Sequence, residues 1–166
     1  NISTTIAASR KIFNIKDNDI INSIQNISIK GRLEEIKSGK LKKIAGNNRL
    51  IVDGGHNISA SLSIANWIKN QNQEVNLIVG MMKDKEHIEF IKSFRNIVNS
   101  ITLIDIPNQD GAISKENLES KLKELNLNIK KSHSIESAIK SLSKNVNTIT
   151  VCIGSLYLAG EILKLN

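Results

Sequence analysis

The sequence predicts a Rossmann-like α/β domain, in which a mostly parallel β-sheet carries helices on both faces. Short, continuous apolar runs of strand length recur from residue 49 to the end of the chain. Each run is followed by a stretch with apolar residues at helical spacing, and glycine or a helix-capping residue often lies between the two. Strands that are apolar on both faces are typical of parallel sheets buried between two layers of helices.

The residues before position 49 lack this alternation. Residues 2–13 and 19–25 carry apolar side chains at helical spacing, and each segment is expected to form a helix. The polar stretch at residues 28–48 is punctuated by glycines and is interpreted as a junction that can hold one hairpin, with strands at residues 33–36 and 40–44.

The α/β domain itself is predicted at residues 49–166. Its strands are expected at residues 49–53, 75–80, 100–106, 128–130 and 148–153. Its helices are expected at residues 57–70, 85–95, 114–125 and 135–143, with a last helix capped by Ser155. The apolar periodicity predicts a buried stripe on each of the first two helices, formed by Ile58, Leu62, Ala65 and Ile68 and by Ile88, Ile91 and Phe94.

The composition limits the class of partner. The net charge is +7, but basic residues are interspersed with acidic ones and aromatic residues make up only 3%. Because single-stranded nucleic acids are bound largely by stacking on aromatic side chains, no nucleic-acid partner is expected. A solvated basic surface and a site for ATP or another polyanion both remain open. No apolar run reaches the length of a membrane span, so no membrane partner is expected either.

The single cysteine, Cys152, lies in an apolar strand-like run. It cannot form an internal disulfide and has no neighbours at metal-ligand spacing, so it is interpreted as a buried strand thiol. A reducing, cytoplasmic location fits this use of cysteine. His87 and His133 lie in or beside polar helical stretches and are expected at the surface.

The residues that follow the strands are the candidates for chemistry, because ligands of open parallel sheets bind beyond the carboxyl ends of the strands. The first strand leads into Asp53-Gly54-Gly55-His56-Asn57. The two glycines permit close backbone approach to a ligand, and Asn57 can cap the next helix. Asp53 and His56 add a carboxylate and an imidazole. An ordinary strand-to-helix turn explains the same five residues equally well.

Two further strands end in segments with polar groups. Lys83 and Lys85 lie in Gly80-Met81-Met82-Lys83-Asp84-Lys85 and could face phosphate or carboxylate, although a solvated loop is the alternative. Ser155 lies in Gly154-Ser155-Leu156-Tyr157-Leu158-Ala159-Gly160-Glu161, where helix capping alone would explain it. The phosphate-binding pattern G-x-x-x-x-G-K-[ST] is absent, so a nucleotide phosphate cradle would have to lie elsewhere.

These three segments, together with Gly31-Arg32-Leu33-Glu34, resemble the carboxy-terminal domain of folylpolyglutamate synthases and bifunctional dihydrofolate synthases. The D-G-x-H-N element is shared across the Mur ligase superfamily, whereas the closing G-S-L-Y-L-x-G-E is particular to the folate branch. The resemblance covers essentially the whole chain. It implies a Mur ligase carboxy-terminal domain at residues 49–166, and it makes residues 1–27 the helical tail of an amino-terminal ATPase domain.

The resemblance also implies an activity: ATP-dependent ligation of L-glutamate to dihydropteroate, or to the γ-carboxylate of a folylpolyglutamate, through an acyl phosphate. The cofactors would be ATP and Mg²⁺, with the metal ligands in the amino-terminal ATPase domain of the same chain. The protein is expected to act as a cytoplasmic monomer on small-molecule substrates. The present chain is then one half of an active site and is expected to be inactive alone.

The family's motifs assign roles position by position. They imply ATP binding by Asn1, Arg32 and Asp53, catalysis by Asp53 and His56, substrate binding by His56, Lys85 and Ser155, and no metal ligand in this chain. Two other functions remain as alternatives: a Mur-type cell-wall peptide ligase domain, and a non-catalytic Rossmann-like binding module.

Overall fold

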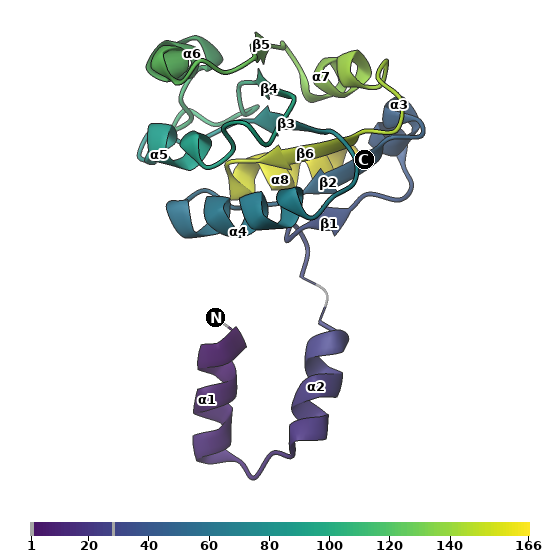
Figure 1. The fold of residues 1–166 in the computed structure, drawn as a ribbon, viewed down its shortest axis with the longest axis vertical. Coiled ribbons are helices and arrows are strands. Elements are labelled where there is room, and N and C mark those ends of the chain that lie inside the picture. Colours follow the sequence, from purple (N-terminus) through teal and green to yellow (C-terminus); the bar gives the residue numbers. More distant parts are fainter. Residues whose placement is uncertain (1, 28) are drawn as a thin grey trace. The chain divides into compact units, whose positions relative to one another are not determined.

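A single six-stranded sheet organises residues 31–166 (Figure 1). The structure is a computed structural model that describes residues 2–27 and 29–166, and the chain separates into this larger unit and a smaller one at residues 1–30. The strand order is β1-β2-β6-β3-β4-β5. The strands are β1 (Glu34–Glu35), β2 (Arg49–Val52), β3 (Val75–Val79), β4 (Ser100–Leu103), β5 (Ile129–Lys131) and β6 (Ile149–Ile153).

The sheet is mostly parallel, because only β1 runs antiparallel to its neighbour, β2. β6 returns from the far side of the sheet and inserts between β2 and β3. The carboxyl ends of β2, β6 and β3 therefore lie next to one another, although more than ninety residues separate the first two along the chain. Such a change in strand order is where open α/β sheets bind ligands.

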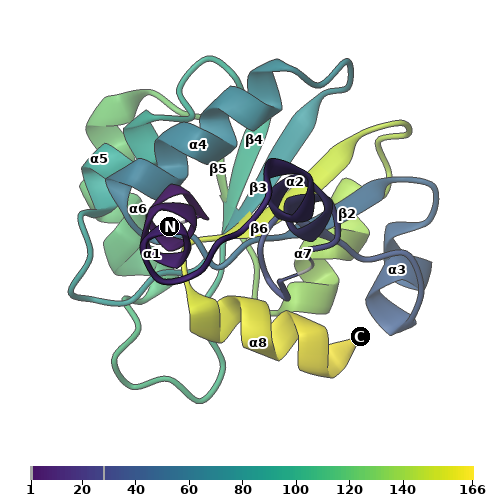
Figure 2. The same ribbon diagram turned by 90° about the horizontal axis from the view of Figure 1, so that it is seen from below.

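Helices cover both faces of the sheet (Figure 2). One layer contains α4 (Ile58–Lys69), α5 (His87–Lys92) and α6 (Lys115–Leu122), which is followed by a short 3-10 turn, η1 (Lys123–Leu125). The other contains α3 (Lys40–Ala45), α7 (Ile135–Leu142) and α8 (Leu156–Leu165). Alternate strand residues enter the two cores: Ile51 packs on the first layer, and Leu50 and Val52 pack on the second. The predicted Rossmann-like fold is confirmed.

The predicted hairpin at residues 33–44 is wrong. Its first strand is reduced to β1, which pairs with β2, and the expected second strand at residues 40–44 is the helix α3. Leu41 and Ala45, four residues apart, fall on one helical face and are buried against α7 and α8. Burial of this face outweighs the alternation of polar and apolar residues that favoured a strand.

The predicted buried stripes of α4 and α5 are each wrong at one position. Leu62 is 59% exposed, and Ser61 is buried in its place. Ser61 can be buried because its hydroxyl donates to Ile58 O and lies 2.8 Å from the hydroxyl of Ser93 beside α5. In α5, Ile88 is 44% exposed, whereas Phe90 is buried and stacks edge to face on Phe94.

Cys152 is a buried strand thiol, as predicted. Burial raises its pKa to about 12, so the thiolate form is strongly disfavoured in the folded chain.

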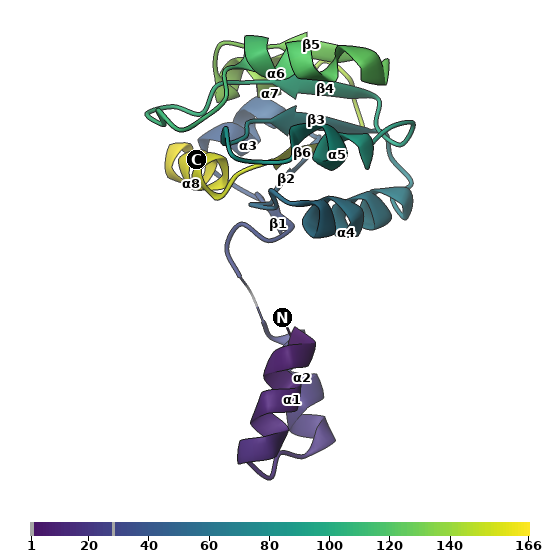
Figure 3. The ribbon, with the colours of Figure 1, turned by 90° about the vertical axis from the view of Figure 1, so that its left-hand side faces the viewer.

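The smaller unit contains the two helices predicted for it, α1 (Ile2–Ile12) and α2 (Asp17–Gln25), which form an antiparallel pair (Figure 1 and Figure 3). Neither helix contains a buried residue, and isoleucine side chains of both, such as Ile6, Ile20 and Ile24, line a groove of about 330 Å³. In the described part of the chain, no helix has the length and apolar character needed to cross a membrane.

Candidate functional site

The loops that leave β2, β6 and β3 are bonded to one another through their glycines. Gly154 N donates to Gly55 O at 3.0 Å, and Gly80 N donates to Ile153 O at 3.3 Å. Gly54 N donates to Gly31 O at 2.8 Å, which adds the segment before β1 to the same cluster. We call these four joined segments the strand-end cluster. Because each bond is between backbone atoms, side chains at this edge are held by a rigid frame.

Gly154 cannot be replaced without backbone strain, and a side chain at Gly54 would displace Leu156. Gly154 has a φ of +109°, and a Cβ there would lie 2.7 Å from Gly80 O. A Cβ on Gly54 would collide with Leu156 Cδ2. The glycines therefore allow the loops after β2 and β6 to approach each other and the start of α8.

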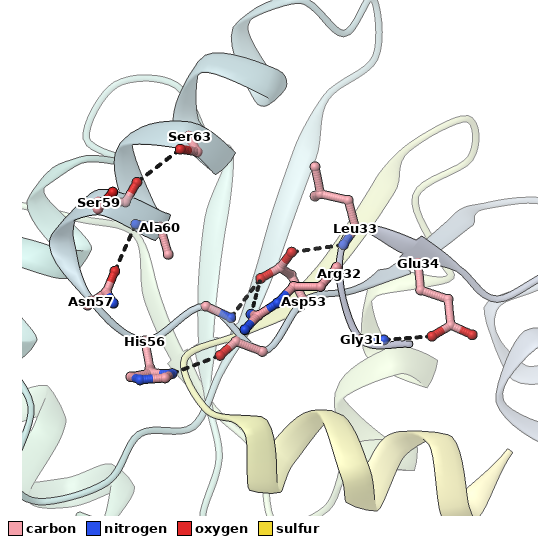
Figure 4. Close-up of polar contacts among 12 residues, drawn as sticks. Gly31, Arg32, Leu33, Glu34, Asp53, His56, Asn57, Ser59, Ala60 and Ser63 are labelled. Carbon is pink, nitrogen blue, oxygen red and sulfur yellow. Dashed lines mark hydrogen bonds and ion pairs between the residues drawn. The ribbon is translucent and has the colours of Figure 1, made fainter. Parts of the chain in front are cut away.

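Asp53 is at the centre of the strand-end cluster (Figure 4). The residue is only 6% exposed, and its carboxylate accepts two backbone hydrogen bonds, from Leu33 N at 2.8 Å and from Gly55 N at 2.6 Å. Arg32 Nη1 lies 3.7 Å from Asp53 Oδ1, while the Arg32 side chain stays 48% exposed. Asp53 thus fixes the backbone on both sides of the cluster and draws the guanidinium group toward it.

The segment before β1 has an unusual backbone that these contacts hold in place. Leu33 has a φ of +41°, a region that a branched, non-glycine residue rarely adopts. Glu34 Oε2 accepts a hydrogen bond from Gly31 N at 2.7 Å and closes the turn (Figure 4). A strained backbone conformation persists only where the surrounding structure holds it in place. At Leu33, the hydrogen bond to the carboxylate of Asp53 helps to hold the positive φ.

A cleft of about 580 Å³ opens beside the strand-end cluster. It is lined by His56, Met82, Lys83, Asp84, Lys85, Gly111, Ser155, Leu156 and Tyr157. His56 Nδ1 lies 2.9 Å from Gly54 O (Figure 4). Since a carbonyl oxygen only accepts, Nδ1 carries the proton, and in the neutral ring Nε2 is left as a hydrogen-bond acceptor.

Helix caps position two sides of this cleft. Asn57 Oδ1 accepts from Ala60 N at 2.9 Å and begins α4, as predicted (Figure 4). Ser155 Oγ accepts from Tyr157 N at 3.0 Å and begins α8. The predicted cap at Ser155 is therefore confirmed, and its hydroxyl proton is still available as a donor.

The opposite wall of the cleft is the loop of residues 82–85 after β3. Lys83 N donates to Gly111 O at 2.8 Å, and Lys83 Nζ donates to Asp110 O at 2.7 Å. Lys85 Nζ lies 2.7 Å from Asp84 Oδ2, and this hydrogen bond is the main cause that lowers the pKa of the Asp84 carboxyl group. The wall therefore presents an ammonium group and a carboxylate that already neutralise each other.

The predicted site residues fall into two neighbouring groups. His56, Lys85 and Ser155 line the cleft, and Arg32 and Asp53 pair in the strand-end cluster. Asn1 lies outside the described residues. Sequence reasoning did not single out Tyr157, although it lies in the G-S-L-Y segment and lines the cleft. Among residues 2–27 and 29–166, no group of three or more His, Cys, Asp or Glu side chains is arranged to hold a metal ion.

The prediction that His87 lies at the surface is wrong, whereas His133 is exposed as expected. His87 is only 3% exposed because α5 begins there and turns the imidazole under the loop of residues 82–85. Its polar sequence neighbours, Glu86 and Glu89, are exposed. The local sequence pattern therefore indicated a surface position for His87 as well.

Comparisons with known proteins agree with the motifs. The family model described as dihydrofolate synthetase, C-terminal domain, matches residues 37–165. A Mycobacterium tuberculosis folylpolyglutamate synthase, complexed with ADP and AMPPCP, is similar over 92% of this chain and 35% of its own, at a TM-score of 0.76 and 17% identity. Escherichia coli FolC, in complex with DHPP and ADP, is similar over 99% of this chain and 38% of its own, at a TM-score of 0.76 and 19% identity.

A bifunctional folylpolyglutamate synthase/dihydrofolate synthase from Yersinia pestis is similar over 92% of this chain and 34% of its own, at a TM-score of 0.74 and 18% identity. A comparison with curated protein sequences gave no match. The chain thus spans about a third of the length of the solved structures it resembles. At these identities the structural likeness establishes the fold.

Proposed function

The chain belongs to the family of dihydrofolate synthetase carboxy-terminal domains, and we propose that it forms one side of the active site of an ATP-dependent glutamate ligase. The observation that carries the proposal is the strand-end cluster. It joins the Arg32–Asp53 pair to a cleft lined by His56, Lys85 and Ser155, at the edge where parallel sheets bind ligands.

The proposed reaction forms one amide bond for each ATP consumed. The γ-phosphoryl group of ATP is transferred to a carboxylate of dihydropteroate, or to the γ-carboxylate of a folylpolyglutamate, which gives an acyl phosphate and ADP. The amine of L-glutamate then attacks the acyl carbon. The tetrahedral intermediate expels inorganic phosphate and leaves the amide. Such a reaction is promoted mainly by positioning the reactants and by neutralising the negative charge that develops.

Arg32 is proposed to bind the phosphates of ATP. Its side chain is half-exposed, and its ion pair with Asp53 is long, so the guanidinium group can donate to a phosphate without first breaking a short bond. Asp53 is proposed to act in ATP binding by holding Arg32 and the turn at Leu33 in place. Asn1 is proposed as a further nucleotide contact on the ground of the family resemblance alone.

His56 is proposed to accept a proton from the ammonium group of L-glutamate, which frees the amine to attack the acyl carbon. Its Nδ1–H is used by Gly54 O, so Nε2 is the free basic nitrogen of the neutral ring. Lys85 and the hydroxyl of Ser155 line the same cleft and are proposed to bind the carboxylates of L-glutamate. The Lys85 side chain is 28% exposed, and its ammonium group can exchange its contact with the exposed Asp84 for a substrate carboxylate.

The described residues fit a nucleotide better than they fit a metal, because they supply a half-exposed guanidinium group but no cluster of metal ligands. Mg²⁺ would neutralise the ATP phosphates, and its protein ligands are proposed to lie in an amino-terminal ATPase domain. We propose that α1 and α2 belong to that domain, which would explain their exposed apolar groove. The complete enzyme is proposed to be a cytoplasmic monomer.

The test is an assay of ATP-dependent ligation by the enzyme in which this chain is joined to its amino-terminal ATPase domain. The proposal expects one ADP and one phosphate for each L-glutamate added to dihydropteroate or to a reduced folate. The 166-residue chain alone is expected to give no turnover. Ligation to a muramyl peptide but not to a pterin acceptor would instead assign the chain to cell-wall synthesis. ATP-independent binding alone would make it a non-catalytic module.

A further inference from the structure

A buried histidine outside the proposed chemistry supports one wall of the cleft. His87 Nε2 lies 2.9 Å from the carbonyl oxygen of Met82, and its backbone N–H donates to Lys85 O at 3.0 Å. These two contacts close the loop of residues 82–87 from within. The same loop carries Met82, Lys83, Asp84 and Lys85 into the cleft.

The contacts of the imidazole fix its protonation. Met82 O only accepts a hydrogen bond, so Nε2 carries the proton. Nδ1 is then an acceptor, and it lies 3.4 Å from Nζ of Lys121 on α6, which only donates. The result is a chain of contacts from the Lys121 ammonium through a neutral imidazole to the Met82 carbonyl.

A second proton on this ring would be unfavourable. It would place an N–H group on Nδ1, directly against the ammonium of Lys121. Burial lowers the pKa of His87 most, and the charge of Lys121 lowers it further, against the opposing effects of the Met82 hydrogen bond and Asp84. The charged groups around the ring are Lys121 from α6, Asp84, Lys85 and Glu86 from the loop, and Glu89 from α5.

The wall is held from its other side by a second set of bonds. Met82 pairs with Ala112 in an isolated antiparallel bridge, Lys83 N donates to Gly111 O, and Ile113 N donates to Met81 O. These contacts fix residues 81–83 to the loop before α6. Met82 is therefore held from both sides, by Ala112 and by His87, and the turn that His87 closes carries Asp84 and Lys85.

We propose that His87 is a positioning residue that places Lys85 for binding the amino-acid substrate, and that it does so as the neutral Nε2–H tautomer. The inference rests on the proposed function, because it takes the cleft as the site of L-glutamate. It assigns His87 no contact with substrate. Its effect is carried by the Met82 carbonyl and by the loop of residues 83–85.

The first experiment needs only the 166-residue chain and no activity. The ¹⁵N shifts of the His87 ring distinguish its tautomers, and hydrogen exchange at the Lys83 amide reports on the wall. His87→Leu removes the donor to Met82 O, whereas His87→Gln keeps an N–H at a similar distance along the side chain. We expect the Nε2–H tautomer in the wild type, and exchange at Lys83 about tenfold faster in His87→Leu but near wild type in His87→Gln.

The amide of Gly154, in the strand-end cluster, is the internal control for this experiment and should exchange at its wild-type rate in both variants. If His87→Leu also speeds exchange there, the effect is global unfolding and the positioning role is wrong. An Nδ1–H tautomer, or equal exchange at Lys83 in the two variants, would overturn the proposal as well.

The second experiment measures L-glutamate kinetics in the complete ligase. His87→Leu should raise KM for L-glutamate about tenfold with little change in kcat, and His87→Gln should restore it. A loss in kcat alone, or no rescue by glutamine, contradicts the inference. If the wild-type enzyme ligates no glutamate at all, the proposed function fails, while the tautomer and exchange results still decide whether His87 positions the wall.

Discussion

The carboxylate of Asp53 accepts a hydrogen bond from the backbone N–H of Leu33, a residue whose φ is +41°. This contact joins the end of β2 to the turn before β1, twenty residues earlier in the chain. The same carboxylate accepts from Gly55 N at the start of the loop that carries His56. Asp53 is therefore a structural link between the Arg32 turn and the cleft as well as a candidate ATP-site residue.

Replacing Asp53 with asparagine should lower both stability and activity. An amide has one acceptor oxygen, so it cannot serve the N–H groups of Leu33 and Gly55 together as the carboxylate does. The free energy of unfolding of the 166-residue chain should fall by roughly 1–3 kcal/mol. Denaturant titration measures this change. Adding Leu33→Gly should recover part of it, because glycine tolerates the positive φ; no recovery would show that the strained turn does not depend on Asp53.

Arg32→Ala should separate function from folding. The Arg32 side chain is half-exposed and its ion pair is long, so the free energy of unfolding should change by no more than about 0.5 kcal/mol. In the complete ligase, kcat/KM for ATP should fall about a hundredfold, since a charge-neutralising donor is lost. Arg95→Ala, another exposed arginine, is the matched control and should leave both quantities unchanged. Near-normal turnover in Arg32→Ala would refute the phosphate role.

Two glycine-to-alanine changes within seven residues should have opposite effects on the free energy of unfolding. Gly154 has a φ of +109° and no room for a Cβ, so Gly154→Ala should destabilise the chain by roughly 1–3 kcal/mol. Gly160 lies inside α8, where a Cβ would meet nothing within 4 Å, so Gly160→Ala should stabilise it by about 0.5–1 kcal/mol. Thermal unfolding of both variants, compared with the wild type, measures the two changes in stability. Equal effects would contradict the close packing described for the strand-end cluster.

Acid should destabilise the fold partly through His87. Its pKa is lowered in the folded chain, so below about 6.5 the unfolded chain binds a proton that the folded chain does not. The free energy of unfolding therefore decreases as the pH falls from about 6.5 toward the lowered pKa of the folded state. His87→Gln should flatten this part of the pH profile, and the exposed His133→Gln should not. A steep profile retained in His87→Gln would assign the acid sensitivity to other groups.

The parallel sheet was predictable because its strands and helices are encoded by local patterns. Residues 50–52 and the strand Ile149–Ile153 are buried on both faces of the sheet, and Asn57, Ser114 and Ser155 cap helices where the sequence places them. Each of these features depends on residues close together in the chain, which is why sequence reasoning could find them.

The errors came from contacts between distant segments. The helix at residues 40–45 owes its buried face to α7 and α8, and Asn166 caps it by accepting from Leu41 N. Ser61 replaces Leu62 in the buried stripe because Ser93 meets its hydroxyl. The candidate site residues were chosen from motifs, and their roles stay predictions. The bond from Leu33 to Asp53 and the burial of His87 depend on tertiary packing that no local pattern contains.

The proposed function is tested most directly by detecting transfer of oxygen through the acyl phosphate intermediate. The measurement uses dihydropteroate or a reduced folate with ¹⁸O in the reacting carboxylate, together with ATP, L-glutamate and the complete ligase. One carboxylate oxygen should appear in the inorganic phosphate for each amide formed, because phosphate leaves with the oxygen that it acquired from the carboxylate. Phosphate without label, or amide formation that does not require ATP, would contradict the assignment of this chain to a glutamate ligase.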